Sequence, residues 1–324
     1  MLTAAAYRAA AGKRRRPEVA AYMRNLFGES ARLRTDILDG SVEVGKMKQF
    51  AIRDPKPRII HAPCFRERVL HHALMHFVGP ALDRTLVHDS YACRVGKGTL
   101  EAVRRVQHHL RRFAWYGKLD VRAYFASIDH EILLGMLRRR FRDAGLLWLI
   151  TRIVHAHETA PGKGLPIGAL TSQHFANLYL GGLDRHLLEH VGVRGLVRYM
   201  DDIAFWCDTR DRTRAAVRAA VGCAADCLDL DIKPQMQINR SVHGITYCGF
   251  RVTRGAVRLT PRRRRRYSEQ RRQWEEAFAA GRLSVRGLQA GYASALAVTA
   301  HAEATGWRRE QLRRCPPLEC CRDL

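Results

Sequence analysis

The sequence predicts an α+β protein, in which helices and strands mix in one core and a basic helical segment follows. Three observations support this prediction. Apolar residues recur at helical spacing in several windows, and short apolar runs bounded by turn residues lie between those windows. From Pro261 onward the chain is strongly basic, beginning with five consecutive arginines at residues 262–266. The length allows two or three subdomains, and no internal repeat is visible.

Helices are expected wherever apolar residues recur every three or four positions. Residues 1–45 are basic, and Pro17 stands where a helix would start. Asp129 opens another helical pattern and is interpreted as its N-cap rather than as a metal ligand. The other expected helices cover residues 66–82, 99–113, 144–156, 171–190, 211–228 and stretches from 261 to about 311.

Strands are expected where short apolar runs end in Gly, Pro, Asn or Asp. Residues 54–57 and 161–164 carry these turn residues. The expected strands cover residues 50–53, 58–61, 115–121, 236–239, 245–251 and 256–259, together with a hairpin over 196–206.

The tip of that hairpin is the most informative feature of the chain. It reads Tyr199-Met200-Asp201-Asp202, so two adjacent carboxylates lie in a tight turn between apolar strands. Adjacent carboxylates repel each other, and a divalent cation such as Mg²⁺ relieves that repulsion. In most proteins an Asp-Asp pair in a turn is only a solvated turn. A second carboxylate motif and the charge of the chain favour the metal site here.

The charge of the chain predicts a polyanionic partner. Lys and Arg number 56 against 31 Asp and Glu, which gives a net charge of +25 over 324 residues. Nucleic acid or an anionic membrane would satisfy this charge. No apolar run of about 18 residues is present, so nucleic acid is favoured, with no membrane partner and a cytoplasmic location. The nine cysteines show no C-x-x-C pairing and are expected to be reduced thiols.

The second carboxylate motif is Lys118-Leu119-Asp120-Val121, where a predicted strand ends in an aspartate. Together with Asp201 and Asp202, Asp120 makes a three-carboxylate site that can hold two metal ions. One ion would lower the pKa of an attacking 3′-hydroxyl, and the other would neutralise the leaving pyrophosphate. Phe125 follows five residues later and could pack under a nucleotide sugar and exclude a 2′-hydroxyl; a core aromatic is the alternative.

These motifs resemble those of reverse transcriptases of the bacterial group II intron-like lineage. KLDVRAYFASID (residues 118–129) is similar to the family's first catalytic motif, and RYMDD (198–202) to its second. Further motifs follow the family's order over roughly residues 50–260, namely Pro55-Lys56-Pro57-Arg58, Arg66-Glu67-Arg68-Val69, Ser90-Tyr91-Ala92-Cys93-Arg94 and Tyr247-Cys248-Gly249-Phe250. The resemblance implies an RNA-directed DNA polymerase with a right-hand fold. Its expected domains are an N-terminal basic helical extension (1–45), fingers (46–118), palm (119–260) and a helical thumb (261–324).

The resemblance also implies roles for single residues. The expected catalytic residues are Asp120, Asp201 and Asp202, and these with Val121 would bind two Mg²⁺ ions, or Mn²⁺. The expected nucleotide-binding residues are Lys56, Arg58, Ala123, Tyr124, Phe125, Ile167, Gly168 and Gln173. The expected primer or template contacts are Tyr199, Met200, Tyr247, Cys248, Gly249, Arg262 and Arg263.

Residues 165–173 indicate a resemblance to one particular group of reverse transcriptases. They read Leu-Pro-Ile-Gly-Ala-Leu-Thr-Ser-Gln, with Ile167 where most reverse transcriptases have glutamine and Gln173 where most have proline. This form is similar to the enzymes of diversity-generating retroelements, which copy a template-repeat RNA and misincorporate opposite adenines. A glutamine could hydrogen-bond the incoming nucleotide, whereas isoleucine offers only apolar contact. The enzyme would therefore select the correct incoming nucleotide less strictly. The alternative for Ile167 is packing alone.

The expected partners are template RNA, an RNA/DNA duplex, dNTPs and, by analogy, a small basic accessory protein oligomer. Alternatives are a reverse transcriptase of an antiphage or CRISPR-linked system, a group II intron protein, which the short chain after the thumb disfavours, and a non-enzymatic RNA-binding protein, which the intact aspartates disfavour. Many polymerases place a proton-donating lysine where this chain reads Pro234-Gln235-Met236-Gln237. Lys233 is near and could substitute.

Overall fold

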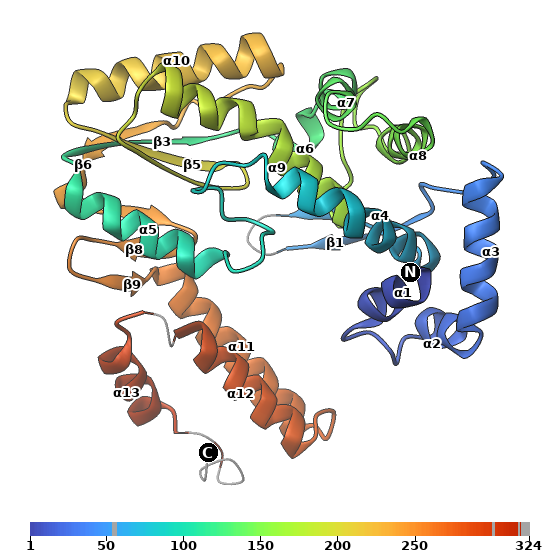
Figure 1. Ribbon diagram of the computed structural model, residues 1–324. Helices are drawn as coiled ribbons and strands as arrows, with labels where there is room; N and C mark the ends of the chain where they lie inside the picture. Colours follow the sequence, from blue (N-terminus) through green and yellow to red (C-terminus); the bar gives the residue numbers. More distant parts are fainter. Residues whose placement is uncertain (54–56, 300–301, 317, 319–324) are drawn as a thin grey trace.

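Four antiparallel strands form the sheet at the centre of the computed structural model, which describes residues 1–53, 57–299, 302–316 and 318 (Figure 1). Their order is β4-β5-β3-β6, so the strand that carries Asp120 lies beside the hairpin that carries Asp201 and Asp202. The strands are β3 (Trp115–Asp120), β4 (Gly195–Tyr199), β5 (Asp202–Cys207) and β6 (Gln237–Arg240).

The two faces of this sheet are covered by different elements, because side chains alternate between the faces along each strand. Ile203 and Phe205 join the core on the side of helices α9 (Leu170–Arg185) and α10 (Arg210–Leu228). Ala204 and Trp206 join a second core on the side of helix α5 (Thr99–Arg112). Figure 1 shows α10 on one side of the sheet and α5 on the other.

A small second sheet completes the α5 side. It consists of β7 (Ile245–Tyr247), β8 (Phe250–Val252) and β9 (Val257–Leu259), paired antiparallel in that order. Residues 245–251 were expected to form one strand, and this expectation was wrong. Cys248 and Gly249 have φ angles of 46° and 78°, so they form the two-residue turn of a hairpin and divide the segment into two strands.

The N-terminal helices pack together with a two-stranded hairpin and a long helix. Ala5, Ala6 and Ala9 of the first helix are buried, and their small side chains let that helix lie close against the long one. The elements are α1 (Leu2–Ala10), α2 (Pro17–Arg24), α3 (Leu26–Leu38), β1 (Met47–Ile52), β2 (Arg58–Pro63) and α4 (Phe65–Asp83). The turn predicted at 54–57, which includes Lys56, lies largely outside the described residues.

Three shorter helices, α6 (Tyr124–Ser127), α7 (His130–Arg138) and α8 (Ala144–His155), follow β3 along the chain. Asp129 caps α7 as predicted, because its carboxylate accepts a hydrogen bond from the Ile132 N–H at 2.9 Å. The helix predicted over 171–190 is α-helical only to Arg185, and residues His186–His190 continue as a π-helix. Ser241–His243 form a short 3₁₀ turn.

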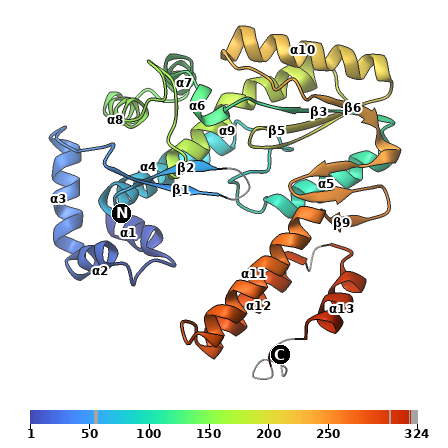
Figure 2. The same ribbon diagram turned by 180° about the vertical axis from the view of Figure 1, so that it is seen from behind.

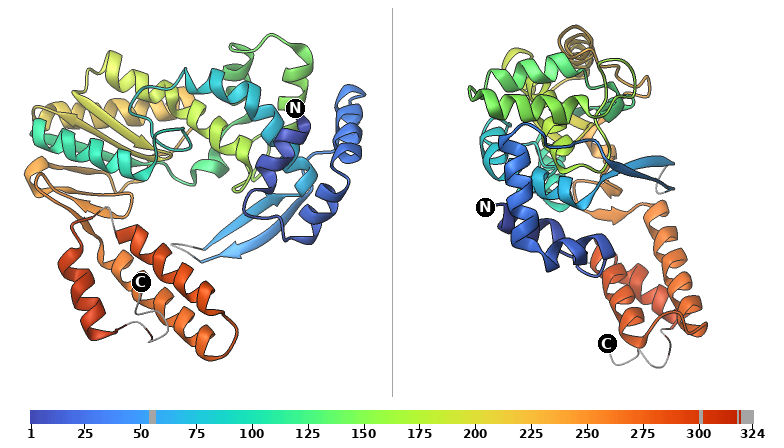
Figure 3. Two further views of the ribbon diagram at one scale, coloured as in Figure 1. Left: turned by 60° about the horizontal axis from the view of Figure 1, so that its bottom comes forward. Right: turned by 90° about the vertical axis from the view of Figure 1, so that its right-hand side faces the viewer.

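The C-terminal helices form a separate arm below the small sheet (Figures 1 and 2). They are α11 (Pro261–Ala279), α12 (Val285–Thr299) and α13 (Thr305–Arg314). Thr260 caps α11, with Pro261 in its first turn. Figure 3 shows the β1–β2 hairpin reaching toward this arm. Among the described residues, no helix combines the length and apolar character that crossing a bilayer requires.

Candidate active site

The turn at residues 199–202, which carries the two adjacent aspartates expected to be catalytic, joins β4 to β5 as predicted. Met200 lies at its tip with a φ angle of 55°, a left-handed conformation that costs a residue with a Cβ about 1 kcal/mol or more. Asp201 and Asp202 follow directly. The surrounding structure must therefore hold this turn in place.

The sheet brings the third carboxylate to the same point. Asp120 and Asp202 are direct cross-strand partners in the β3–β5 ladder, and the Val121 N–H donates to the Asp201 carbonyl at 3.4 Å. Directly opposed residues project from the same face of a sheet, so these two side chains lie side by side. Antiparallel pairing thus brings Asp120 beside two adjacent aspartates that come much later in the sequence.

Two of the three carboxyls, those of Asp201 and Asp202, have pKa values above the usual range. Burial raises the pKa of the Asp201 carboxyl, and the nearby charge of Asp120 raises it further. Burial also raises the pKa of Asp202, to about 6, while the Lys118 ammonium opposes this shift. Like charges in close proximity produce such shifts, and a bound cation would relieve them.

Two lysines provide positive charge at the site. The Lys118 Nζ lies 3.2 Å from Asp202 Oδ1. The Lys233 Nζ contacts Asp120 Oδ1, and the Lys233 N–H donates to the Asp120 carbonyl at 2.8 Å. Oxygen ligands at Asp120, Asp201 and Asp202 suit Mg²⁺ or Mn²⁺. The side chain of Val121 is fully buried, so only its backbone carbonyl could serve as a ligand.

The segment after Asp120 turns sharply beside the carboxylates. Ala123 has a φ angle of 45°, which places its N–H and that of Tyr124 at a bend before α6. The side chain of Tyr124 points into the core, where its hydroxyl donates to the Ala176 carbonyl. Phe125 is half-buried, and its carbonyl accepts from the Leu165 N–H at 2.7 Å. Phe125 thereby ties the loop before α9 to the palm.

The loop before α9 is also hydrogen-bonded to the β1–β2 hairpin. The Ile167 carbonyl accepts from the His61 N–H at 2.8 Å. Gly168 has a φ angle of 127°, and a Cβ there would lie 2.9 Å from the His61 carbonyl oxygen, so close approach to β2 requires glycine. Arg58, at the start of β2, acts to lower the pKa of Asp201, which places its positive charge near the carboxylates.

Gln173 lies in the first turn of α9. Its Oε1 accepts from the Cys93 Sγ at 3.2 Å. Cys93 has a φ angle of 55°, and the neighbouring Ala92 carbonyl accepts from the Asn177 Nδ2 at 2.6 Å. The 91–94 loop is therefore held to α9 at two points.

Two of the expected primer contacts, Tyr199 and Tyr247, lie on the α5 side of the central sheet. Tyr199 is partly buried against that core, whereas the Tyr247 side chain is fully buried. Its hydroxyl donates to the Asp202 carbonyl at 2.8 Å and to the Val197 carbonyl at 3.2 Å, so it holds both strands of the β4–β5 hairpin. The Arg263 Nη2 donates to the Cys248 carbonyl at 2.9 Å, and its guanidinium lies 4.1 Å from the Phe250 ring centre.

A basic cleft of about 530 Å³ lies between the end of β1 and α11 of the C-terminal arm. Arg53, at the end of β1, lines it together with one face of α11. The α11 residues that line it are Arg262, Arg265, Arg266, Glu269, Gln270 and Gln273. A cleft of this charge suits a nucleic-acid backbone.

Several site residues escaped the sequence analysis. Lys118 stands two positions before Asp120, so strand alternation places both on one face and could have revealed it. Arg198 interrupts the apolar run of β4, and a charged residue in a buried strand is itself a signal. The supporting role of the Tyr247 hydroxyl has no local signal, because its acceptors lie 45 and 50 residues away.

Comparison with known proteins was made on sequence and on structure. A family model described as reverse transcriptase (RNA-dependent DNA polymerase) matches residues 50–252. Protein YkfC of Escherichia coli (strain K12) is 26% identical over 200 residues, which cover 57% of this chain and 52% of that protein. The group II intron-encoded protein LtrA of Lactococcus lactis subsp. cremoris is 23% identical over 142 residues, 41% of this chain and 23% of that protein. The chain thus spans about half or less of these relatives.

The apo telomerase structure from Candida tropicalis superposes with a TM-score of 0.51 and 11% identity, covering 88% of this chain and 63% of that one. This likeness concerns the fold alone. It confirms the predicted α+β right-hand architecture, with its antiparallel sheet and surrounding helices.

Proposed function

Because the chain belongs to the reverse transcriptase family, we propose that it is an RNA-directed DNA polymerase. The observation that carries this proposal is the direct pairing of Asp120 with Asp202 beside the turn that holds Asp201. A protein that only bound RNA would have no use for three mutually repelling carboxylates at one point. Its substrates would be a template RNA, the growing RNA/DNA duplex and dNTPs.

We propose the domains that the resemblance implies, which are an N-terminal extension (1–45), fingers (46–118), palm (119–260) and thumb (261–324). Asp120, Asp201, Asp202 and the Val121 carbonyl would hold two Mg²⁺ ions, which when bound activate the 3′-hydroxyl and neutralise the departing pyrophosphate. Arg58 would bind the triphosphate, and so would Lys56, which lies outside the described residues.

The polymerase chemistry also requires positioning of the sugar and the base. The N–H groups of Ala123 and Tyr124 would bind phosphate oxygens at the bend before α6. Phe125 would pack under the sugar and exclude a 2′-hydroxyl. Arg263 holds the Cys248–Gly249 turn against α11, so we propose that it places that turn beside the primer.

A finer proposal concerns fidelity. We infer that the enzyme misincorporates at template adenines and makes mutagenic cDNA for targeted gene diversification, assisted by a small basic accessory protein. Ile167 and Gln173 support this inference, because an apolar side chain at 167 offers no hydrogen bond to the incoming nucleotide. The Ile167 backbone is fixed to β2 through His61, so a substitution there would change the side chain without releasing the loop.

Primer extension on an RNA template with Mg²⁺, followed by sequencing of the cDNA, tests both the polymerase proposal and the fidelity proposal. We expect extension by the wild-type protein, loss of extension with retained RNA binding in Asp202→Asn, and errors concentrated opposite adenines. Ile167→Gln should lower the error rate at adenines by about 10-fold or more.

Each outcome separates the possibilities. Accurate extension would keep the polymerase and contradict the diversifying role, in favour of an antiphage, CRISPR-linked or other group II-like reverse transcriptase. An unchanged error spectrum in Ile167→Gln would show that this residue only packs. Equal extension by Asp202→Asn would contradict the assignment of the site.

A further inference from the structure

We propose that Arg198 is a positioning residue that fixes the Met200–Asp201 peptide, acting from the face of the sheet opposite the carboxylates. The inference rests on the proposed polymerase function and adds a residue to the machinery of that site. Strand alternation separates the two faces, because Tyr199 pairs with Asp202 whereas Arg198 pairs with Ile203. Arg198 therefore supports the turn without contacting substrate.

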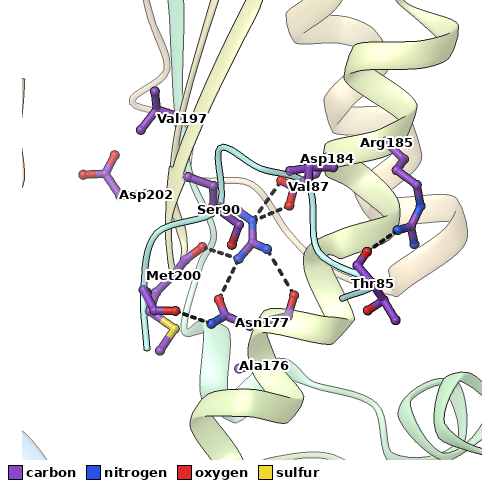
Figure 4. Close-up of polar contacts among 12 residues, drawn as sticks. Thr85, Val87, Ser90, Ala176, Asn177, Asp184, Arg185, Val197, Met200 and Asp202 are labelled. Carbon is purple, nitrogen blue, oxygen red and sulfur yellow. Dashed lines mark hydrogen bonds and ion pairs between the residues drawn. The ribbon is translucent and has the colours of Figure 1, made fainter. Parts of the chain in front are cut away.

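The Arg198 guanidinium is fully buried, and each of its three nitrogens has an acceptor; the acceptor residues Asp184, Asn177 and Met200 are labelled in Figure 4. Its Nε lies 2.8 Å from both carboxylate oxygens of Asp184, and its Nη2 donates to the Asn177 carbonyl at 3.1 Å. Its Nη1 donates to the Asn177 Oδ1 at 3.1 Å and to the Met200 carbonyl at 3.2 Å. One rigid, planar group thus connects helix α9 to the tip of the catalytic turn.

The Met200 carbonyl is the important acceptor in this set. Met200 has a left-handed φ angle of 55°, so the turn is strained for a residue with a side chain. The same peptide unit that contains this carbonyl contains the Asp201 N–H. A hydrogen bond to the carbonyl therefore fixes the plane of the peptide and the direction in which the Asp201 carboxylate leaves the backbone.

Stability alone does not account for this arrangement. Burying an ion pair requires the removal of water from both charges, and apolar residues of similar volume are often as stable or more stable. Burial acts to raise the pKa of Asp184, and the adjacent Arg198 charge opposes that shift. An apolar pair could fill the space between α9 and β4, but it could not donate a hydrogen bond to Met200.

The same guanidinium is also linked, through Asn177, to the 91–94 loop that contacts Gln173, one of the expected nucleotide-binding residues. Asn177, which accepts from Arg198, donates its Nδ2 to the Ala92 carbonyl. The next residue, Cys93, donates to Gln173. Contacts therefore run from the catalytic turn through Arg198 and Asn177 to the 91–94 loop, so one buried side chain sets the turn and the loop relative to α9.

Arg198→Lys tests the proposal. A lysine keeps the charge and the apolar stem and can pair with Asp184, but its single ammonium cannot also reach Asn177 and the Met200 carbonyl. We expect kcat in primer extension to fall by about 10- to 100-fold, because small displacements of reacting groups have effects of this size. The KM for dNTP should stay within about twofold, since the proposed triphosphate contacts, Arg58 and the Ala123 and Tyr124 N–H groups, are not among the hydrogen-bond partners of Arg198.

A second readout does not depend on activity. Mn²⁺ binding, followed by the EPR signal of the free ion, should weaken by about 10-fold in Arg198→Lys, because the Asp201 carboxylate is no longer held in place. If the wild-type protein binds Mn²⁺ but extends no primer, the polymerase proposal fails. The Mn²⁺ comparison between variant and wild type still decides the role of Arg198.

Arg185→Lys is the matched control. Arg185 lies on α9 next to Asp184, the ion-pair partner of Arg198, and its Nη1 donates to the Thr85 carbonyl at 2.7 Å, away from the turn (Figure 4). This variant should keep wild-type kcat and Mn²⁺ affinity, because, among the residues that the structure describes, Arg185 makes no hydrogen bond to the turn. The double variant Arg198→Met/Asp184→Leu should fold, since no unpaired charge remains, and should be at least as impaired as Arg198→Lys.

Two results would overturn the proposal. One is wild-type kcat and Mn²⁺ affinity in Arg198→Lys. The other is a loss of both in Arg185→Lys that matches the loss in Arg198→Lys at equal melting temperature, since that would show a general effect of stability.

Discussion

Asp89, in the loop between α4 and α5, shows how one residue can join several elements. Its carboxylate accepts from the Tyr91 hydroxyl at 3.0 Å and from the Arg105 Nη2 at 2.9 Å, while its carbonyl accepts from the Arg198 N–H at 2.9 Å. Burial acts to raise the pKa of this carboxyl, but His109 and Arg105 outweigh burial and hold the pKa well below its usual range. The charged form of Asp89 therefore stabilises the fold.

We predict that Asp89→Asn lowers the free energy of unfolding by about 2 kcal/mol at pH 7. The unfolded chain takes up a proton on Asp89 near pH 4 and the folded chain does not, so this contribution is complete above that pH and is lost as the pH falls below it. Urea unfolding at pH 7 and pH 3.5 should show a smaller difference from wild type at the lower pH. Asp211→Asn, at an exposed position on α10, is the control. An equal loss at both pH values would contradict the prediction.

At the scale of elements, the close contact between β3 and β5 depends on a glycine. Gly117 pairs directly with Phe205, and a Cβ at position 117 would lie 2.5 Å from the Phe205 Cζ. Phe205 is fully buried and packs on the α9–α10 side of the sheet. The phenyl ring therefore occupies the space that any larger residue at position 117 would need.

Gly117→Ala should therefore destabilise the protein by about 1–3 kcal/mol, because Phe205 must move within a packed core. Gly135→Ala is the comparison, since Gly135 lies within α7 and a Cβ there meets no neighbouring atom within 4 Å. That substitution should stabilise the protein by about 0.5–1 kcal/mol. Thermal unfolding of both variants would check the pair. A Gly117→Ala protein as stable as Gly135→Ala would show that the core adapts freely.

Elements whose signal is local were predictable from the sequence. The α4 and α5 patterns, the Asp129 cap and the hairpin around Met200 each depend on residues a few positions apart. The division at Cys248–Gly249 was missed, because the apolar pattern of the segment continues through the turn. The support of the site by Arg198 could not be foreseen, since Asp184 and Asn177 lie 14 and 21 residues away and meet it only after folding.

At the scale of the whole molecule, part of the positive charge of the chain lines a cleft between two distant segments. The net charge is +25, and the basic cleft lies between the end of β1 and α11. Figures 1 and 3 show these two parts far apart in sequence yet facing each other. A nucleic-acid duplex held between them would lie under the carboxylates at the centre of the palm.

We predict that Arg53→Gln/Arg265→Gln weakens binding of an RNA/DNA duplex at every sequence tested. The slope of log affinity against log salt concentration should fall in magnitude by about 1.5, because fewer counterions are released on binding when two phosphate contacts are lost. Arg214→Gln/Arg218→Gln removes the same charge from α10, on the far side of the palm sheet (Figure 1), and should leave the slope unchanged. Fluorescence anisotropy at several salt concentrations measures both. Equal slopes for the two double variants would show that only net charge matters.

The ion pairs of Asp120 with Lys233 and of Asp202 with Lys118 have a consequence for the resting protein. Its acidic centre already carries two built-in counter-ions, so the repulsion among the aspartates is reduced before any metal ion binds. Binding of Mg²⁺ would then exchange one cation for another. The ammonium groups released by that exchange remain tethered within a side chain's length of the reaction, where newly formed negative charge will appear.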